Sequence, residues 1–172
     1  MQTIDLESMA IAMPHVAGHP NRQGFRGVLT LIDVASDRAP AGARGHRVVL
    51  TRAAAEGALA SLLGMAIDYA PSLDRHDCRR KVGIITRADV VGKRLELGGY
   101  LFAKDFPEIV TKLSRRMTAG GTRDLGMSYE ITDARIADMR AKVWTLTQVT
   151  FTGAAILRRD KAAYSDTWIE LE

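Results

Sequence analysis

Residues 81–102 read KVGIITRADVVGKRLELGGYLF, and this stretch predicts the hairpin at the centre of the fold. Aliphatic and β-branched residues dominate segments 81–91 and 94–102, a composition that is typical of strands. Gly92 separates the two segments and favours a tight turn between them. Gly98 and Gly99 indicate a bulge in this strand pair. The stretch therefore predicts a pair of antiparallel strands.

Strand and helix patterns continue on both sides of this hairpin. Strands are predicted at 25–34, 47–50, 125–131 and 142–151. Helices are predicted at 51–64, from 105 to the glycines at 120–121, and at 154–164. This order predicts an α+β fold, in which a mainly antiparallel sheet or small β-barrel is surrounded by helices.

The helix that begins at Asp105 has the clearest signals. Asp105 and Glu108 form a capping-box pattern, and Pro107 lies in the first turn. One apolar stripe follows at helical spacing, made of Phe106, Ile109, Val110, Leu113 and Met117. We expect most of this stripe to pack on the sheet.

Composition and charge exclude several classes of protein. The 172 residues fit one domain, which we expect at 25–172 after an irregular segment at 1–24. The single cysteine, Cys78, excludes a disulfide framework, and no apolar run is long enough to span a membrane. The net charge of +4 comes from scattered arginines with few aromatic residues, which argues against specific nucleic-acid binding.

The histidines and glycines give no signal for a metal or a cofactor. His15 and His19 are four residues apart, but the segment contains proline and glycine and does not favour a helix that would align them. No glycine pattern matches a phosphate-binding loop. We therefore predict neither a metal site nor a cofactor.

His76 and Ser128 are the candidate catalytic residues. His76 lies in a polar loop, DRHD at 74–77, before the first strand of the hairpin. Ser128 lies in LGMSYE at 125–130, two residues after Gly126, which allows another segment to approach the backbone closely. Each residue alone is typical of a solvated side chain. Together they provide a hydroxyl nucleophile and a base, provided that the fold brings them within hydrogen-bond distance.

The order of these motifs resembles the phage prohead (capsid maturation) proteases, relatives of the herpesvirus assemblins. Those enzymes have a histidine in a loop, a serine in a later G-x-S strand and a closing strand of the type L-x-E-V-S. Here 52 residues separate His76 from Ser128, and LTQVT at 146–150 stands where the closing strand is expected. The resemblance covers residues 27–157.

This resemblance implies a serine peptidase in which Ser128 is the nucleophile and His76 the general base, with no cofactor. The implied fold is a β-barrel surrounded by helices. The implied substrates are scaffold and capsid-protein segments, and the enzyme itself, inside the procapsid in the host cytoplasm. The herpesvirus relatives dimerise through helices, so a homodimer is also possible here.

The third catalytic position departs from the family pattern. Gln148 stands where many of these proteases have the glutamate that orients the histidine. A two-residue period places Gln148 on one strand face with Trp144 and Leu146, aimed at the imidazole. An amide oxygen can accept the imidazole N–H but cannot stabilise an imidazolium with a full charge. The alternative acids are Asp68, Asp77 and Glu130.

Arg158 and Arg159 are the candidates for the oxyanion site. In the herpesvirus relatives, a basic pair after the closing strand helps to hold the oxyanion, and these two arginines follow that strand here. The alternative is a pair of solvated arginines at the start of a helix.

Two other functions remain open at this point. The chain could be a capsid-assembly or scaffold component that retains the protease fold without catalysis, an interpretation that Gln148 favours. It could also be an unrelated α+β binding domain in which the histidine and the G-x-S motif coincide by chance.

Overall fold

The computed structural model describes residues 9–12, 14, 16–118 and 124–172. The predicted hairpin is present as β5 (Lys81–Val91) and β6 (Arg94–Leu101), paired antiparallel around Gly92 at φ +57°. The ladder shifts register between Ile85 and Arg87 opposite the two glycines, which leaves Thr86 as the extra residue on β5. The predicted bulge is therefore confirmed, with its extra residue on the first strand.

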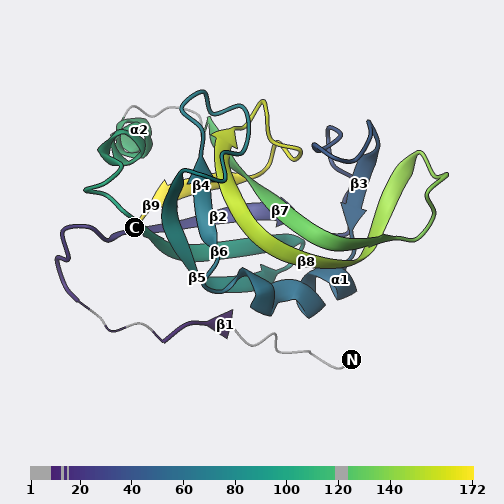
Figure 1. Cartoon of the computed structure of the whole chain (residues 1–172), viewed down its shortest axis with the longest axis horizontal. Coiled ribbons are helices and arrows are strands. Elements are labelled where there is room, and N and C mark those ends of the chain that lie inside the picture. Colours follow the sequence, from purple (N-terminus) through teal and green to yellow (C-terminus); the bar gives the residue numbers. More distant parts are fainter. Residues whose placement is uncertain (1–8, 13, 15, 119–123) are drawn as a thin grey trace.

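The described strands form one sheet of mostly antiparallel pairs. The strand order is β3-β8-β4-β5-β6-β2-β9, with β1 added to β5 and β7 added to β8. The remaining bounds are β1 (Met9–Ala10), β2 (Gln23–Leu31), β3 (Arg47–Leu50), β4 (Ala66–Tyr69), β7 (Leu125–Ile136), β8 (Val143–Arg158) and β9 (Trp168–Leu171). The sheet curls into a half-barrel, and the fold is α+β, as predicted (Figure 1).

The long strand β8 organises the half-barrel. It pairs antiparallel with β7 along most of its length, and on its other side it pairs in parallel with β3 and then with β4. The helix predicted at 154–164 is wrong, because β8 continues to Arg158. The apolar run at 154–157 fits a helix or a doubly buried strand equally well, and its burial between β4 and β7 decides for the strand.

Of the other two predicted helices, the first begins after Thr51 as expected, whereas the second begins at Pro107 and not at Asp105, whose side chain instead accepts a hydrogen bond from Asn21. Thr51 caps α1 (Arg52–Ala58) by accepting the Ala54 N–H at 3.2 Å, and a short 3-10 turn, η1 (Leu59–Leu62), follows. α2 (Pro107–Thr118) buries Ile109 and Leu113. The side chain of Met117 and the glycines at 120–121 lie outside the described residues. No helix in the described ranges is long and apolar enough to cross a membrane.

The segment after β8 is tied back to the sheet by Tyr164. Its hydroxyl lies 3.1 Å from the carbonyl oxygens of Val34 and Val48. Burial raises the pKa of Tyr164 to about 12, so the phenol stays protonated and able to donate. These two hydrogen bonds hold the segment between β8 and β9 against β3 and the residues before it.

The close packing around Gly126 gives a test of the fold. A Cβ at Gly126 would lie 2.5 Å from the Thr167 hydroxyl, which accepts the Met127 N–H at 3.1 Å. We expect Gly126→Ala to lower the free energy of unfolding by about 1–3 kcal/mol, because the neighbouring segment must move. Gly57→Ala is the matched control in α1, where nothing lies within 4 Å. Urea denaturation should show the control gaining about 0.5–1 kcal/mol; a neutral Gly126→Ala would contradict the packing.

Candidate active site

Ser128 and His76 meet at the edge of the half-barrel. Ser128 lies on β7, and His76 lies on the loop between β4 and β5. The distance between His76 Nε2 and Ser128 Oγ is 3.1 Å, a hydrogen-bond distance. The sequence analysis predicted this contact, and the structure brings the two side chains together across 52 residues of chain.

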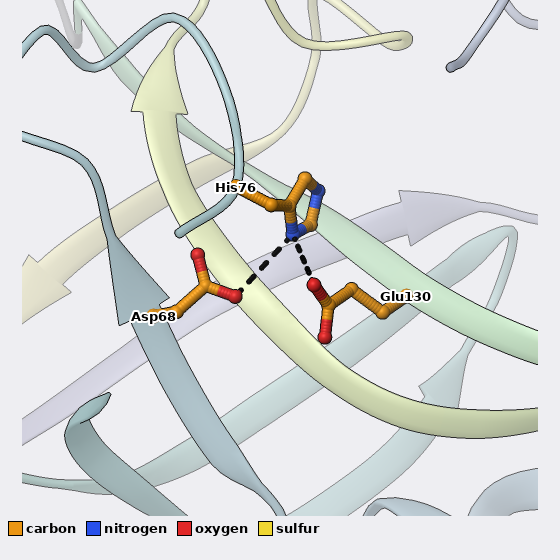
Figure 2. A group of neighbouring side chains, drawn as sticks. All are labelled: Asp68, His76 and Glu130. Atoms are coloured by element: carbon orange, nitrogen blue, oxygen red, sulfur yellow. Dashed lines mark ion pairs between the residues drawn. The ribbon is translucent and has the colours of Figure 1, made fainter. Parts of the chain in front are cut away.

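Two carboxylates face the other ring nitrogen of His76. Nδ1 lies 3.1 Å from Glu130 Oε1 and 3.4 Å from Asp68 Oδ2. Figure 2 shows the imidazole edge pointing between these carboxylates, which come from β7 and β4. Both were alternatives to Gln148 in the sequence analysis. The third alternative, Asp77, instead accepts the backbone N–H of Arg79 at 3.1 Å.

The register of three strands explains how Asp68 and Ser128 come to flank one histidine. Ala155 on β8 pairs with Asp68 on β4 and with Ser128 on β7. Paired residues point to the same face of a sheet, and strands lie about 4.8 Å apart, so the Cα atoms of Asp68 and Ser128 are roughly 10 Å apart. Ala155 carries only a methyl group, which leaves space above it for the imidazole of His76.

Gly153 makes the corresponding space for Glu130. The two residues pair across β7 and β8, and a Cβ at Gly153 would lie 2.9 Å from Glu130 Oε2. This role of Gly153 was not predicted from the sequence. The signal was present in the GAA run at 153–155, where small residues alternate along one strand face opposite Glu130 and Ser128.

Asp68 also holds the loop that carries His76. Its side chain is fully buried, and Oδ1 accepts the Asp77 N–H at 3.0 Å. Lys81 Nζ lies 3.8 Å from Oδ2 and supplies a compensating positive charge. A buried carboxylate requires such partners, so the contacts of Asp68 fix the loop position as well as facing the imidazole.

Gln148 is not at the site, and its prediction as the third catalytic residue is wrong. The side chain is exposed, and its Cα partner on β7 is Arg135. Seven residues of β8 separate Gln148 from Ala155, roughly 20 Å at about 3.3 Å per residue. The two-residue period fails because the β7–β8 ladder shifts register between Arg135 and Ile136, which leaves Thr147 as an extra residue on β8, and Thr147 and Gln148 are both exposed.

The guanidinium groups of Arg158 and Arg159 are held by neighbouring residues, and their oxyanion role stays a prediction. The Arg158 guanidinium makes two 2.9 Å contacts with Asp160, and this pairing raises the pKa of Arg158 and lowers that of Asp160. Arg159 donates to the Ser165 carbonyl at 2.6 Å and lines a different cavity, beside Arg26. The alternative placed these arginines at the start of a helix, but Arg158 is the last residue of β8.

The same cluster offers a donor set for a divalent cation. One ligand atom each from Asp68, His76 and Glu130 lies within 4.8 Å of the others, and a histidine with two carboxylates suits Zn²⁺. The Lys81 ammonium competes for the same oxygen of Asp68. His19 takes no part, since its Nδ1 accepts the Asn21 N–H at 3.1 Å, and His15 lies outside the described residues.

Comparison with known proteins adds no relative. No protein-family model, curated protein or solved structure significantly matches the chain.

The stability of Asp68 variants tests whether this residue holds the loop that carries His76. We expect Asp68→Ala to lower the free energy of unfolding by about 2–4 kcal/mol, because it leaves the Asp77 N–H unpaired and removes the partner of Lys81. Asp77→Ala, the control, keeps that N–H and should cost less than about 1 kcal/mol. Urea denaturation measures both, and hydrogen exchange in loop 74–80 should rise only in Asp68→Ala. Equal losses in the two variants would contradict the anchoring role.

Proposed function

We propose that this chain is a serine peptidase in which Ser128 is the nucleophile and His76 the general base. The observation that carries the proposal is the two-sided environment of His76. One ring nitrogen lies 3.1 Å from the serine hydroxyl, while the other faces two carboxylates. A serine hydroxyl beside an imidazole, with carboxylates close to the second ring nitrogen, is the set of groups that activates a serine for nucleophilic attack.

The proposed reaction uses His76 first as a base and then as an acid. Ser128 Oγ attacks the peptide carbonyl carbon while Nε2 takes the hydroxyl proton. The tetrahedral intermediate collapses as the imidazolium returns that proton to the leaving amine nitrogen, and the C–N bond breaks. Water then attacks the acyl-serine ester, again losing its proton to Nε2, and the peptide acid leaves as Ser128 regains its hydrogen.

The two carboxylates have different parts in this proposal. Glu130 Oε1 is the nearer to Nδ1, and its side chain is 26% exposed, so it serves as the acid that selects the tautomer and stabilises the imidazolium. Asp68 is fully buried and shares its charge with Lys81, so it chiefly positions the loop and adds negative potential behind the ring.

The peptide-cleaving and phage assignments rest on the motif resemblance. The α+β half-barrel and the order of the His76, Ser128 and closing-strand segments support a capsid maturation protease of the prohead type. Its proposed substrates are scaffold and capsid-protein segments, and the chain itself, inside the procapsid in the host cytoplasm. No cofactor enters the reaction, and a homodimer is part of the same proposal.

The feature that favoured a non-catalytic protein, the absence of an acid beside the histidine, is not found in the structure. Gln148 suggested a site without an acid, whereas Glu130 and Asp68 supply two. We would therefore return to a non-catalytic scaffold component only if the protein cleaves no peptide.

Variants of the four residues test the proposed reaction. Cleavage of a proteome-derived peptide library, followed by mass spectrometry, should be abolished in Ser128→Ala and His76→Ala. Glu130→Gln should lower the rate by about 10²-fold or more, towards the ~10⁴-fold loss caused by the wrong tautomer in a serine triad. Gln148→Glu is the control, with a new charge on the same sheet but remote from His76, and should change the rate less than about twofold. Cleavage that persists in Ser128→Ala would refute the assignment.

A further inference from the structure

Two polar atoms in the cluster of Asp68, His76 and Glu130 are buried without a hydrogen bond. They are Asp68 Oδ2 and His76 Nδ1, and neither has a hydrogen-bond partner among the described residues. The Asp68 side chain is 0% exposed, and its other oxygen accepts the Asp77 N–H. Lys81 Nζ lies 3.8 Å from Oδ2, which is too far for a hydrogen bond. Buried polar atoms normally have partners, so this pair of atoms indicates a ligand that binds between them.

The spacing of the donor atoms is close to that of ligands around a tetrahedral metal ion. His76 Nδ1 lies 3.1 Å from Glu130 Oε1 and 3.4 Å from Asp68 Oδ2. Zinc bonds of about 2.0–2.2 Å at tetrahedral angles set neighbouring ligand atoms roughly 3.3–3.6 Å apart. One atom from each side chain lies within 4.8 Å of the others, so the two oxygens need to approach by no more than about 1.5 Å. Figure 2 shows the imidazole edge pointing between the two carboxylates, where the ion would bind.

The cluster combines fixed ligands with access from solvent. The Asp77 N–H orients the Asp68 carboxylate, and Ser128 Oγ lies 3.1 Å from the second ring nitrogen of His76. Outer contacts of this kind hold metal ligands in position. The side chains of His76 and Glu130 are each 26% exposed, and both line a cavity that Ser128 also lines. An ion can therefore enter from solvent, as a metal site requires.

We propose that Asp68, His76 and Glu130 form a Zn²⁺ site, and that the bound ion prevents His76 from acting as a base. One imidazole and two carboxylates are donors that Zn²⁺ accepts, with a fourth position left for water. The ligands come from β4, from the loop before β5 and from β7, so no single motif in the sequence indicates them. The inhibitory part rests on the peptidase function proposed above, whereas the binding site does not.

The inhibition follows from the single lone pair that a neutral imidazole can offer. One ring nitrogen carries the hydrogen, and the other carries the lone pair that accepts a proton. With the hydrogen on Nδ1, the lone pair of Nε2 faces the Ser128 hydroxyl. Zn²⁺ binds the lone pair of Nδ1, so the hydrogen moves to Nε2, which then donates to Ser128 Oγ. The ring keeps the same number of protons, but the serine loses its base.

Two neighbouring residues supply the controls. Cys78 is an exposed thiol on the loop that carries His76, and cysteine also binds Zn²⁺, so every measurement uses the Cys78→Ser background. Asp77 is adjacent to His76 in sequence, but its carboxylate accepts the Arg79 N–H. Glu130→Gln and Asp77→Asn each replace one carboxylate by an amide of the same shape. Isothermal titration calorimetry with zinc chloride measures the affinity, and the visible absorption of added Co²⁺ measures the coordination geometry.

We expect one Zn²⁺ per chain and a tetrahedral Co²⁺ spectrum. Loss of an outer contact alone weakens metal binding about 10–100-fold, so removal of a ligand in Glu130→Gln should weaken it about 100-fold or more. Asp77→Asn should change the affinity less than about threefold, because its carboxylate is not a ligand. Zn²⁺ should also stop the hydrolysis of p-nitrophenyl acetate by Ser128, measured as the difference from Ser128→Ala. The inhibition should follow the occupancy of the site, and EDTA should reverse it.

The metal site and the peptidase function fail in different ways. No Zn²⁺ binding in the Cys78→Ser background, or equal binding in Glu130→Gln, would overturn the metal site. Full ester hydrolysis by Ser128 with the site occupied would overturn the inhibition and leave the site standing. Metal-free rates equal to those of Ser128→Ala would overturn the peptidase function and the inhibition with it, while calorimetry would still decide whether the three residues bind Zn²⁺.

Discussion

The pairing of Ala155 with strands on both sides is the constraint on which the site depends. It sets Asp68 and Ser128 on one face of the sheet at a separation that a single imidazole spans. The buried Asp68 carboxylate then needs partners, and it finds them in the Asp77 N–H and Lys81. The loop that carries His76 is thus fixed by the same charge that faces its ring. Such coupling of folding and site geometry holds the side chains of the proposed active site in place without a bound ligand.

Local signals in the sequence predicted much of the fold. The hairpin around Gly92, the bulge opposite the paired glycines and the cap at Thr51 each depend on residues close in sequence. The helix predicted at 154–164 failed, because an apolar run has no intrinsic preference between a helix and a strand buried on both faces. Its neighbours β4 and β7 decide the outcome, and those pairings are long-range.

The candidate site was also predictable only in part, because some of its residues meet through long-range strand pairing. His76 and Ser128 could be matched through motif order, and Glu130 could be placed by the two-residue period that puts it on the Ser128 face. Asp68 could be no more than an alternative, because its approach depends on parallel pairing between β4 and β8. The same period misplaced Gln148, since the ladder irregularities at the far end of β7 and β8 break the alternation there.

The central claim is that His76 activates Ser128, and covalent modification tests it most directly. The chain is exposed to diisopropyl fluorophosphate, its intact mass is measured, and the modified residue is located by tandem mass spectrometry. The account predicts an adduct on Ser128 in the wild-type protein and none above background in His76→Ala, which retains the hydroxyl but lacks the base. Modification at other residues with Ser128 unmodified, or equal modification of Ser128 in both proteins, would contradict it.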